Sequence, residues 1–384
     1  MNRTTHLATR LATRLSMHGT PLRTTRLALL ALAGVLSFGA GCAGTQTSAA
    51  PLVRTDAGVQ WPVKTREHVD LWLHAYALLV DDTTTVPLFA RGYRDEVTVA
   101  KNARNLYTGL DSSRAALATT LRARPELEGA QFVALYFGSW EEMRQAFDYF
   151  LKADGDPNKA GNREVQGIIA FLGLQFPKAE GREFARRLMS GVESERERFF
   201  HAWWVEQQRL RTPSLAAVDT LWQRKWRPLL QRYLNHTQQA NGDLILSLPL
   251  GGEGRSVPAG KSASQYAVSW PRTADSAEVA LFTFVHEAAG VIASSAVNDN
   301  LTPAQQREGA GTRLSSAGLV RGGALLMAHV GAAEAERYAR YYLAQMGRTV
   351  PATGALAALE AAFPMPEEML TSMRRQIEIA FAGI

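Results

Sequence analysis

Residues 277–298 read AEVALFTFVHEAAGVIASSAVN, a run with no proline and one internal glycine, Gly290. Apolar residues fall on every side of the helix that this run predicts, which is typical of a helix buried in a core. The middle of the run carries a polar pair, His286 and Glu287. Burying both groups costs free energy unless they pair or bind something. The sequence therefore predicts a buried central helix that carries the most informative site of the chain.

The segments around this helix indicate its neighbours. Residues 243–250 and 265–270 have the composition of strands, and the second run ends at a proline. The Gly-Gly-Glu-Gly run at 251–254 indicates a turn, because it lacks the spacing of a phosphate-binding loop. Residues 314–330 form a helical run rich in glycine and alanine, and we expect it to lie directly on the central helix.

Most of the chain before residue 239 has helical periodicity. Helices are predicted at 65–82, 112–124, 130–153 with a break at Gly138-Ser139, 164–174, 181–190, 193–210 and 214–236. We expect a predominantly helical α+β protein, with a helical lobe at 63–238 and a lobe at 239–384 that holds a small sheet and the central helix. The two lobes can also form a single domain of residues 63–384.

The charge of the chain argues against a nucleic-acid partner. The whole sequence has a formal net charge of +6. Residues 1–42 hold five arginines and no acidic residue, so the remaining chain has 37 basic against 36 acidic side chains. A nearly neutral chain offers no general attraction for a polyanion. The single cysteine, Cys42, excludes an internal disulfide and a cysteine-based zinc site.

The N-terminus has the layout of a secretion signal. Arg23 and Arg26 precede an apolar run at 27–38, which is followed by Gly-Ala-Gly and Cys42. The apolar run is too short to span a membrane. Met17 is an alternative start, because residues 17–42 alone make a well-proportioned signal.

This layout resembles a bacterial lipoprotein signal at residues 1–42, although Gly39 stands where that signal usually has a larger apolar residue. The resemblance implies acylation of the Cys42 thiol and a membrane-anchored protein of the bacterial cell envelope. Ala43 after the cysteine favours the outer over the inner membrane by the same analogy. Ordinary signal cleavage nearby is the alternative. Residues 43–62 are rich in small and polar residues and are expected to form a flexible tether.

The order of two strands, a buried His-Glu helix and further helices resembles the zincin-like metallopeptidases of the gluzincin type, over residues 243–347. In that family the helix carries His-Glu-x-x-His, because residues i and i+4 share a face and reach one zinc ion. The resemblance implies that His286 is a zinc ligand and Glu287 the general base.

Two family ligands are missing from this sequence. Gly290 stands at the position of the second histidine, and residues 313–333, where a gluzincin would supply a glutamate, hold no acidic residue. Replacement ligands would have to come from elsewhere, such as His329, His201, His236 or His74. We therefore expect no cofactor, with zinc bound only if the site has been rebuilt. Arg321 is the expected charge partner of a buried Glu287.

Three functions remain open. The first is an envelope lipoprotein with a degenerate zincin-like domain that binds a peptide or envelope protein, or acts as a scaffold, without catalysis. The second is a metal-dependent peptidase with a rearranged site that uses Glu287 as its general base. The third is a purely helical envelope protein unrelated to zincins, in which residues 243–250 and 265–270 form no sheet beside the central helix.

Overall fold

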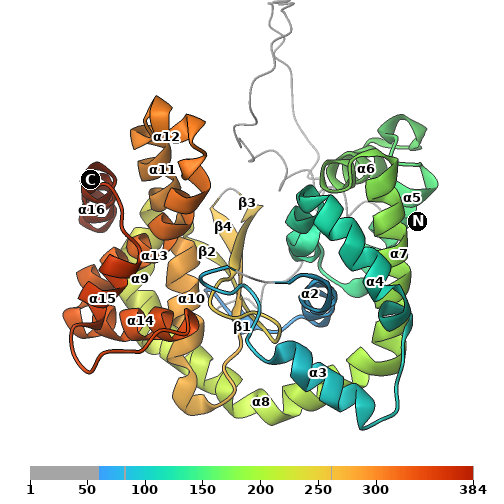
Figure 1. Cartoon of the computed structure of the whole chain (residues 1–384), viewed down its shortest axis with the longest axis horizontal. Coiled ribbons are helices and arrows are strands. Elements are labelled where there is room, and N and C mark those ends of the chain that lie inside the picture. The colour runs from blue at the N-terminus through green and yellow to red at the C-terminus, as the bar shows by residue number, and fades with distance from the viewer. Residues whose placement is uncertain (1–59, 82–83, 261, 384) are drawn as a thin grey trace, which may run out of the picture.

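The computed structural model describes residues 60–81, 84–260 and 262–383. These residues form many helices around a small mixed sheet, which confirms the predicted class of a predominantly helical α+β protein. Figure 1 shows the helices of residues 67–195 on one side, those of residues 227–236 and 278–382 on the other, and the long helix α8 (His201–Leu221) running between them. The predicted signal at 1–42, with Cys42, lies outside the described residues.

The helices of the first part of the chain lie in sequence between β1 and β2. They are α2 (Glu67–Leu79), α3 (Tyr93–Asn102), α4 (Gly109–Ala123), η1 (Pro125–Tyr136), α5 (Trp140–Lys152), η2 (Pro157–Lys159), α6 (Arg163–Gln175), α7 (Lys178–Glu195), α8 (His201–Leu221) and α9 (Arg227–His236). Two π-helical turns, Arg196–Phe200 and Trp222–Trp226, join α7 to α8 and α8 to α9.

The predicted helix break between residues 210 and 214 is wrong, because Pro213 lies inside α8. Side chains on both sides of this proline hold the helix against the segment that follows the sheet. Arg211 donates to the carbonyl of Trp270 at 2.9 Å, and Ser214 donates to that of Pro271 at 2.7 Å. These tertiary contacts offset the hydrogen bond that proline cannot make.

Four strands form the sheet: β1 (Val63–Lys64), β2 (Asn241–Ser247), β3 (Arg255–Gly260) and β4 (Ala263–Ser269). Their spatial order is β1-β2-β4-β3, in which the first three are parallel and β3 runs antiparallel to β4. Leu244 of β2 stands opposite both Val63 and Tyr266. The edge position of β3 suits Pro258, because proline cannot donate to a sheet ladder.

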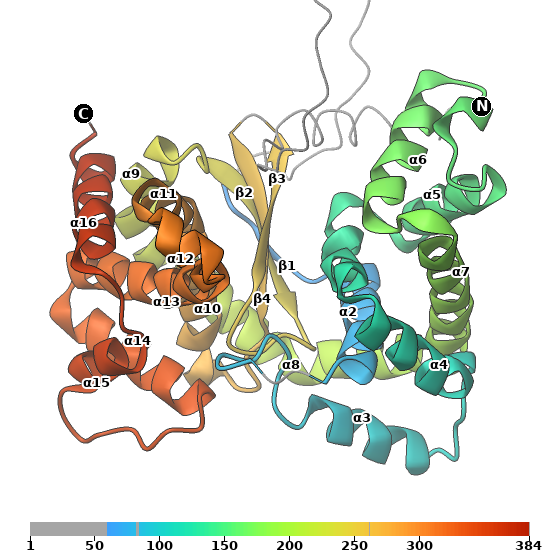
Figure 2. The ribbon, with the colours of Figure 1, turned by 45° about the horizontal axis from the view of Figure 1, so that its top comes forward.

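The strands predicted at 243–250 and 265–270 are confirmed as β2 and β4. Helix α10 packs against β4, so the purely helical alternative is wrong. The predicted turn at 251–254 is followed by a strand that the pattern did not indicate, since β3 contains proline and glycine. Figure 2 shows the sheet standing between the C-terminal helices and the N-terminal helices.

The C-terminal part packs around α10. Its helices are η5 (Ala274–Ser276), α10 (Glu278–Ala288), α11 (Gly290–Asn300), α12 (Pro303–Arg307), α13 (Ala310–Val330), α14 (Ala332–Gln345), α15 (Ala355–Ala362) and α16 (Glu367–Ala382). The predicted central helix is thus divided into α10 and α11, which meet at Ala289.

Helix α13 lies directly on α10 and α11, as its small residues predict. A Cβ added at Gly322 would lie 3.3 Å from the Cβ of Ala289 and 3.5 Å from that of Ala293. The run 274–300 is long and apolar enough to cross a membrane, but 67% of its apolar window is buried in the fold. It is therefore the core helix that the sequence predicts.

One main hydrophobic cluster runs through both predicted lobes. Its centre is aromatic: Trp61, Trp222, Tyr266 and Phe284 contact one another with ring centroids 4.6 to 5.9 Å apart. Trp61 is fully buried and donates to the carbonyl of Ala240 at 3.2 Å. The predicted tether at 43–62 therefore extends too far along the chain, because Trp61 already belongs to the packed fold.

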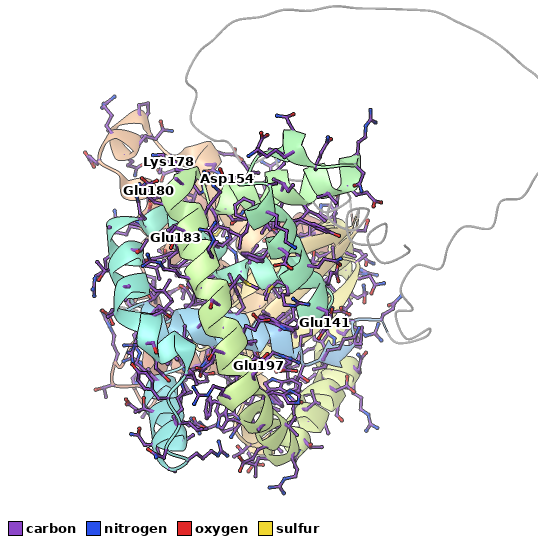
Figure 3. All side chains as sticks on the ribbon, turned by 90° about the vertical axis from the view of Figure 1, so that its right-hand side faces the viewer. Glu141, Asp154, Lys178, Glu180, Glu183 and Glu197 are labelled. Carbon is purple, nitrogen blue, oxygen red and sulfur yellow. The ribbon has the colours of Figure 1, made fainter. Side chains whose placement is uncertain are left out.

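The outward face of α7 is charged. Figure 3 labels Glu180 and Glu183 on α7 and Glu197 just beyond it. The carboxylate of Glu183 accepts from Arg186 and Arg187, which are one turn further along the helix. Solvent-exposed ion pairs of this kind contribute little to stability, so this face is a solvated helix surface.

Candidate functional site

His286 and Glu287 lie in the last turn of α10, between the sheet and α14. The His286 side chain is 1% exposed and that of Glu287 is 10% exposed. The Nδ1 atom of His286 lies 3.0 Å from Oε1 of Glu287. The Tyr342 ring stacks on the imidazole, with centroids 5.3 Å apart, and its hydroxyl donates to the carbonyl of Gly252 at 3.0 Å.

Glu287 is held against the turn that leads into β3. Its Oε1 accepts from the backbone N–H of Gly254 at 3.2 Å. This close approach requires glycine, because a Cβ at position 254 would collide with the carbonyl oxygen of Ala267. Burial by itself raises the pKa of Glu287, but His286, Arg255 and the Gly254 amide favour the charged form, so the pKa is lowered overall. The site therefore holds a carboxylate.

The tautomer of His286 follows from this carboxylate. An ionised carboxylate only accepts hydrogen bonds, so Nδ1 of His286 carries the proton that it donates to Glu287. The Nε2 atom is then a lone-pair acceptor when the ring is neutral and a donor when the ring is protonated. It is buried and has no hydrogen-bond partner among the described residues. This nitrogen can take up a proton or a metal ion.

The described residues do not complete a metal site around this nitrogen. They contain no group of three or more His, Cys, Asp or Glu side chains arranged to hold a metal ion. The space beside Gly290 is met by an apolar side chain, because a Cβ there would lie 3.3 Å from Cδ2 of Leu319 on α13. The position of the second family histidine is thus packed against a leucine.

Three of the four histidines considered as replacement ligands have other partners. His329 stacks on Phe381, with ring centroids 3.9 Å apart. His201 lies 3.0 Å from Glu67, and His74 lies 3.0 Å from Glu195. The structure therefore does not bring these three side chains to His286.

The predicted pairing of Arg321 with Glu287 is wrong. Arg321 donates to the carboxylate of Glu360 at 2.9 Å and to the carbonyl of Phe363 at 3.4 Å. These acceptors belong to α15 and the residue after it, so the guanidinium lies on the side of α13 that faces α15. After His286 itself, the side chain whose charge favours ionised Glu287 is Arg255 of β3, a segment that the sequence pattern did not reveal as a strand.

The edge of β3 that has no partner strand among the described residues begins beside this pair, and η1 contacts the strand. Among the described residues, β3 pairs with β4 on one side and with no strand on the other. Arg255, at its start, is exposed, and its guanidinium carbon lies 5.1 Å from the centre of the Phe132 ring in η1. An extended segment added to this edge would therefore enter next to Glu287.

A second buried His–Glu pair went unrecognised in the sequence. His74 Nε2 lies 3.0 Å from Oε1 of Glu195, and both side chains are fully buried. Lys101 donates to the other carboxylate oxygen at 2.8 Å. The charges alternate in sign over residues 193–198, which is typical of a solvated helix face, but Glu195 lies on the buried face instead. The spacing of Leu188, Val192 and Glu195 was the signal that places it on the buried face.

Comparison of the chain with protein-family models, with curated proteins and with solved structures finds no match.

Proposed function

We propose that this chain is an envelope lipoprotein whose zincin-like domain binds an extended peptide segment of an envelope partner without cleaving it. The open edge of β3 beside the ionised Glu287 is the observation that carries the proposal. An extended peptide adds to such an edge through main-chain hydrogen bonds. The lipid at Cys42 would hold the protein at the envelope membrane, facing the periplasm and on the outer rather than the inner membrane.

The absence of cleavage is argued from the ligands. A catalytic zinc site takes three protein ligands and one open position. Of the three ligand positions that the resemblance implies, only His286 carries a ligand side chain, and Leu319 packs against Gly290. Glu287 retains its charge, but a carboxylate that holds no metal-bound water has no nucleophile to activate.

Peptide binding and metal content test this proposal together on the full chain purified in detergent. We expect a pool of random peptides to be retained by the immobilised chain and recovered at unchanged mass. We expect zinc content after zinc incubation and buffer exchange to match that of His286→Ala. Cleavage that requires zinc and disappears in Glu287→Gln would instead establish the metal-dependent peptidase, which the open Nε2 of His286 favours.

A pair of proline substitutions locates the binding edge. Successive N–H groups of a strand point to opposite sides, so Arg255→Pro and Ser256→Pro remove one N–H that faces β4 and one that faces outward. We expect the variant with unchanged melting temperature to bind peptide about tenfold more weakly, as loss of one buried hydrogen bond predicts. Arg255→Ala controls for the lost charge. Equal peptide binding by both proline variants would overturn the assignment to β3.

A further inference from the structure

A cavity lies where the parallel strands β2 and β4 end. It has a volume of about 260 Å³ and is closed by α3, α8 and the start of α10. Its walls include Tyr93, Glu96, Arg211, Leu248, Trp270 and Val279. Val279 lies two helical turns before His286 on α10, so this cavity is separate from the His286–Glu287 pair. Ligand sites in sheets with parallel strands commonly occur beyond the carboxyl ends of those strands.

Arg211 is the chemical centre of this cavity. The residue is only 7% exposed, and no ion pair of its guanidinium occurs among the described residues. A guanidinium has five N–H donors, and the hydrogen bond of this side chain in the described structure is the one to the Trp270 carbonyl. A buried charge is normally paired or bound to something. Burial, together with the nearby charge of Arg272, lowers the pKa of Arg211.

The nearest buried acid does not supply the missing charge. Asp70 accepts from Ser247 at 2.6 Å and from Trp204 at 2.8 Å. Its carboxyl has a pKa raised to about 7, because burial outweighs these hydrogen bonds. The acid is therefore largely neutral below pH 7 and fully occupied by other donors. Glu96, on the wall of the same cavity, attracts the Arg211 guanidinium but forms no ion pair with it in the described structure, so donors of Arg211 remain for a bound anion.

The rest of the cavity restricts the kind of anion. The walls next to Arg211 are apolar, with Leu248, Val279 and the Trp270 ring, whose centre lies 5.8 Å from the guanidinium carbon. At the mouth, Arg272 pairs with Glu96, and the Arg272 side chain is 64% exposed. The cavity offers one buried guanidinium, and the Glu96 carboxylate at its mouth repels anions. A ligand with a single negative charge therefore fits better than a phosphate dianion, and the apolar walls suit a hydrocarbon group.

We propose that this cavity binds a small monocarboxylate with an apolar substituent. Arg211 binds the carboxylate, and Trp270 and Val279 contact the substituent. Arg272 lies at the entrance, where its ion pair offsets the negative charge of Glu96. The same chemistry is offered by a free organic acid and by the C-terminal carboxylate of a peptide that ends in an apolar residue. This site acts independently of peptide binding along β3, because the two lie at different elements of the sheet.

Calorimetric titration of the full chain in detergent with matched probes tests the site. Phenylacetate is the free acid, and phenylacetamide is its neutral control. A leucine-terminated tetrapeptide, with a free or an amidated C-terminus, represents the peptide source, and inorganic phosphate represents a different anion. We expect phenylacetate to bind and phenylacetamide not to bind. Tighter binding by the free-acid peptide than by both phenylacetate and the amidated peptide would identify a peptide terminus as the source.

Three variants show whether the binding uses this cavity. Arg211→Gln removes the charge and is expected to weaken carboxylate binding about 10- to 100-fold, as loss of a charged hydrogen-bond partner predicts. Val279→Phe fills the cavity, keeps Arg211 and is expected to abolish binding. Arg211→Lys keeps the charge, provides a folded comparison if Arg211→Gln unfolds, and is expected to bind more weakly than the native chain but more tightly than Arg211→Gln.

Several results would overturn the proposal. They are no binding of any carboxylate probe at millimolar concentration, equal binding of the acid and its amide, or phosphate binding tighter than carboxylate binding. Unchanged binding in Val279→Phe would also overturn it, because the cavity would then not be the site.

Discussion

The molecule contains two buried His–Glu pairs with the same 3.0 Å contact, and they are completed to different degrees. In the N-terminal part, His74 and Glu195 come from different helices and meet Tyr93 and Lys101 as well. In the C-terminal part, His286 and Glu287 are neighbours on one helix. Glu287 gains one further hydrogen bond, from Gly254, and Nε2 of His286 gains none within the described structure.

The difference separates a structural pair from a pair that can still bind. Burial alone raises the pKa of Glu195, but His74 and Lys101 lower it to about 2. Thr108 also donates to this carboxylate, and Asp111 lies 2.7 Å from Lys101. A network with partners on all sides stabilises one arrangement of α2, α3, α4 and α7. The His286 ring differs, because its Nε2 atom is buried without a hydrogen-bond partner among the described residues.

The same substitution at the two glutamates should show this contrast most strongly. Glu195→Gln leaves Lys101 and His74 with a neutral partner in a fully buried network, and we expect the free energy of unfolding to fall by about 4 kcal/mol. Glu287→Gln keeps an oxygen for the Gly254 N–H, and we expect a change within about 1 kcal/mol. Urea denaturation monitored by tryptophan fluorescence measures both. Equal losses would show that the two pairs serve the same structural purpose.

The pH dependence of stability should separate two more groups in the N-terminal part, His68 and Asp70 on α2. Burial and the charge of Arg66 lower the pKa of His68 from 6.5 to about 4, so the unfolded chain binds its proton first as pH falls. The contribution of His68 to stability therefore rises with pH up to 6.5. The pKa of Asp70 is raised from 3.8 to about 7, so its contribution falls as pH rises towards 7.

These two contributions nearly cancel between pH 4.5 and 6.5. Each amounts to about 3 kcal/mol over that range, at about 1.4 kcal/mol per pH unit. We expect these two groups to leave the free energy of unfolding of the native chain nearly independent of pH in this range. The free energy of unfolding of Asp70→Asn should rise by about 3 kcal/mol as pH rises from about 4.5 to 6.5, and that of His68→Gln should fall by about as much. Denaturant midpoints at several pH values measure this. Parallel slopes in the two variants would contradict the assigned pKa directions.

Rebuilding the missing ligands should convert the open pair into a metal site. Gly290→His and Leu319→Glu together place a histidine one turn after His286 and an acid on the facing helix α13. We expect the double variant to bind about one zinc ion and, at a zinc concentration 100 times Kd, to gain about 2 to 3 kcal/mol of stability. Adding His286→Ala should remove this gain. Zinc binding that survives this third change would place the metal elsewhere.

The parts of the fold with strong periodicity were predictable from the sequence. Strands β2 and β4, the buried α10 and the small-residue helix α13 all follow from local patterns. Strand β1 has two residues, and its position depends on pairing with Leu244, which lies far away in the sequence. Strand β3 has a proline and a register shift, so its place at the sheet edge comes from tertiary pairing and not from propensity.

Only the two adjacent residues of the site, His286 and Glu287, were predictable from the sequence. His286 and Glu287 stand together because they are adjacent, and the sequence shows this directly. Their other contacts, Gly254 and Tyr342, come from the turn before β3 and from α14, and no pattern links those residues to α10. Arg321 was assigned to Glu287 because it is the one cation of the helix predicted at 314–330. Glu360 on α15 competes for it successfully because it lies on the same side of α13.

The fully buried Trp61 and the two-residue strand β1 have a mechanical consequence. Any tension transmitted along the chain from its N-terminal side reaches the fold at Trp61, whose carbonyl accepts from Trp222 at 3.0 Å. The first elements to detach under load would be this ring and the short ladder of β1. Under tension, the segment around Trp61 and β1 is therefore expected to detach before the rest of the sheet unfolds.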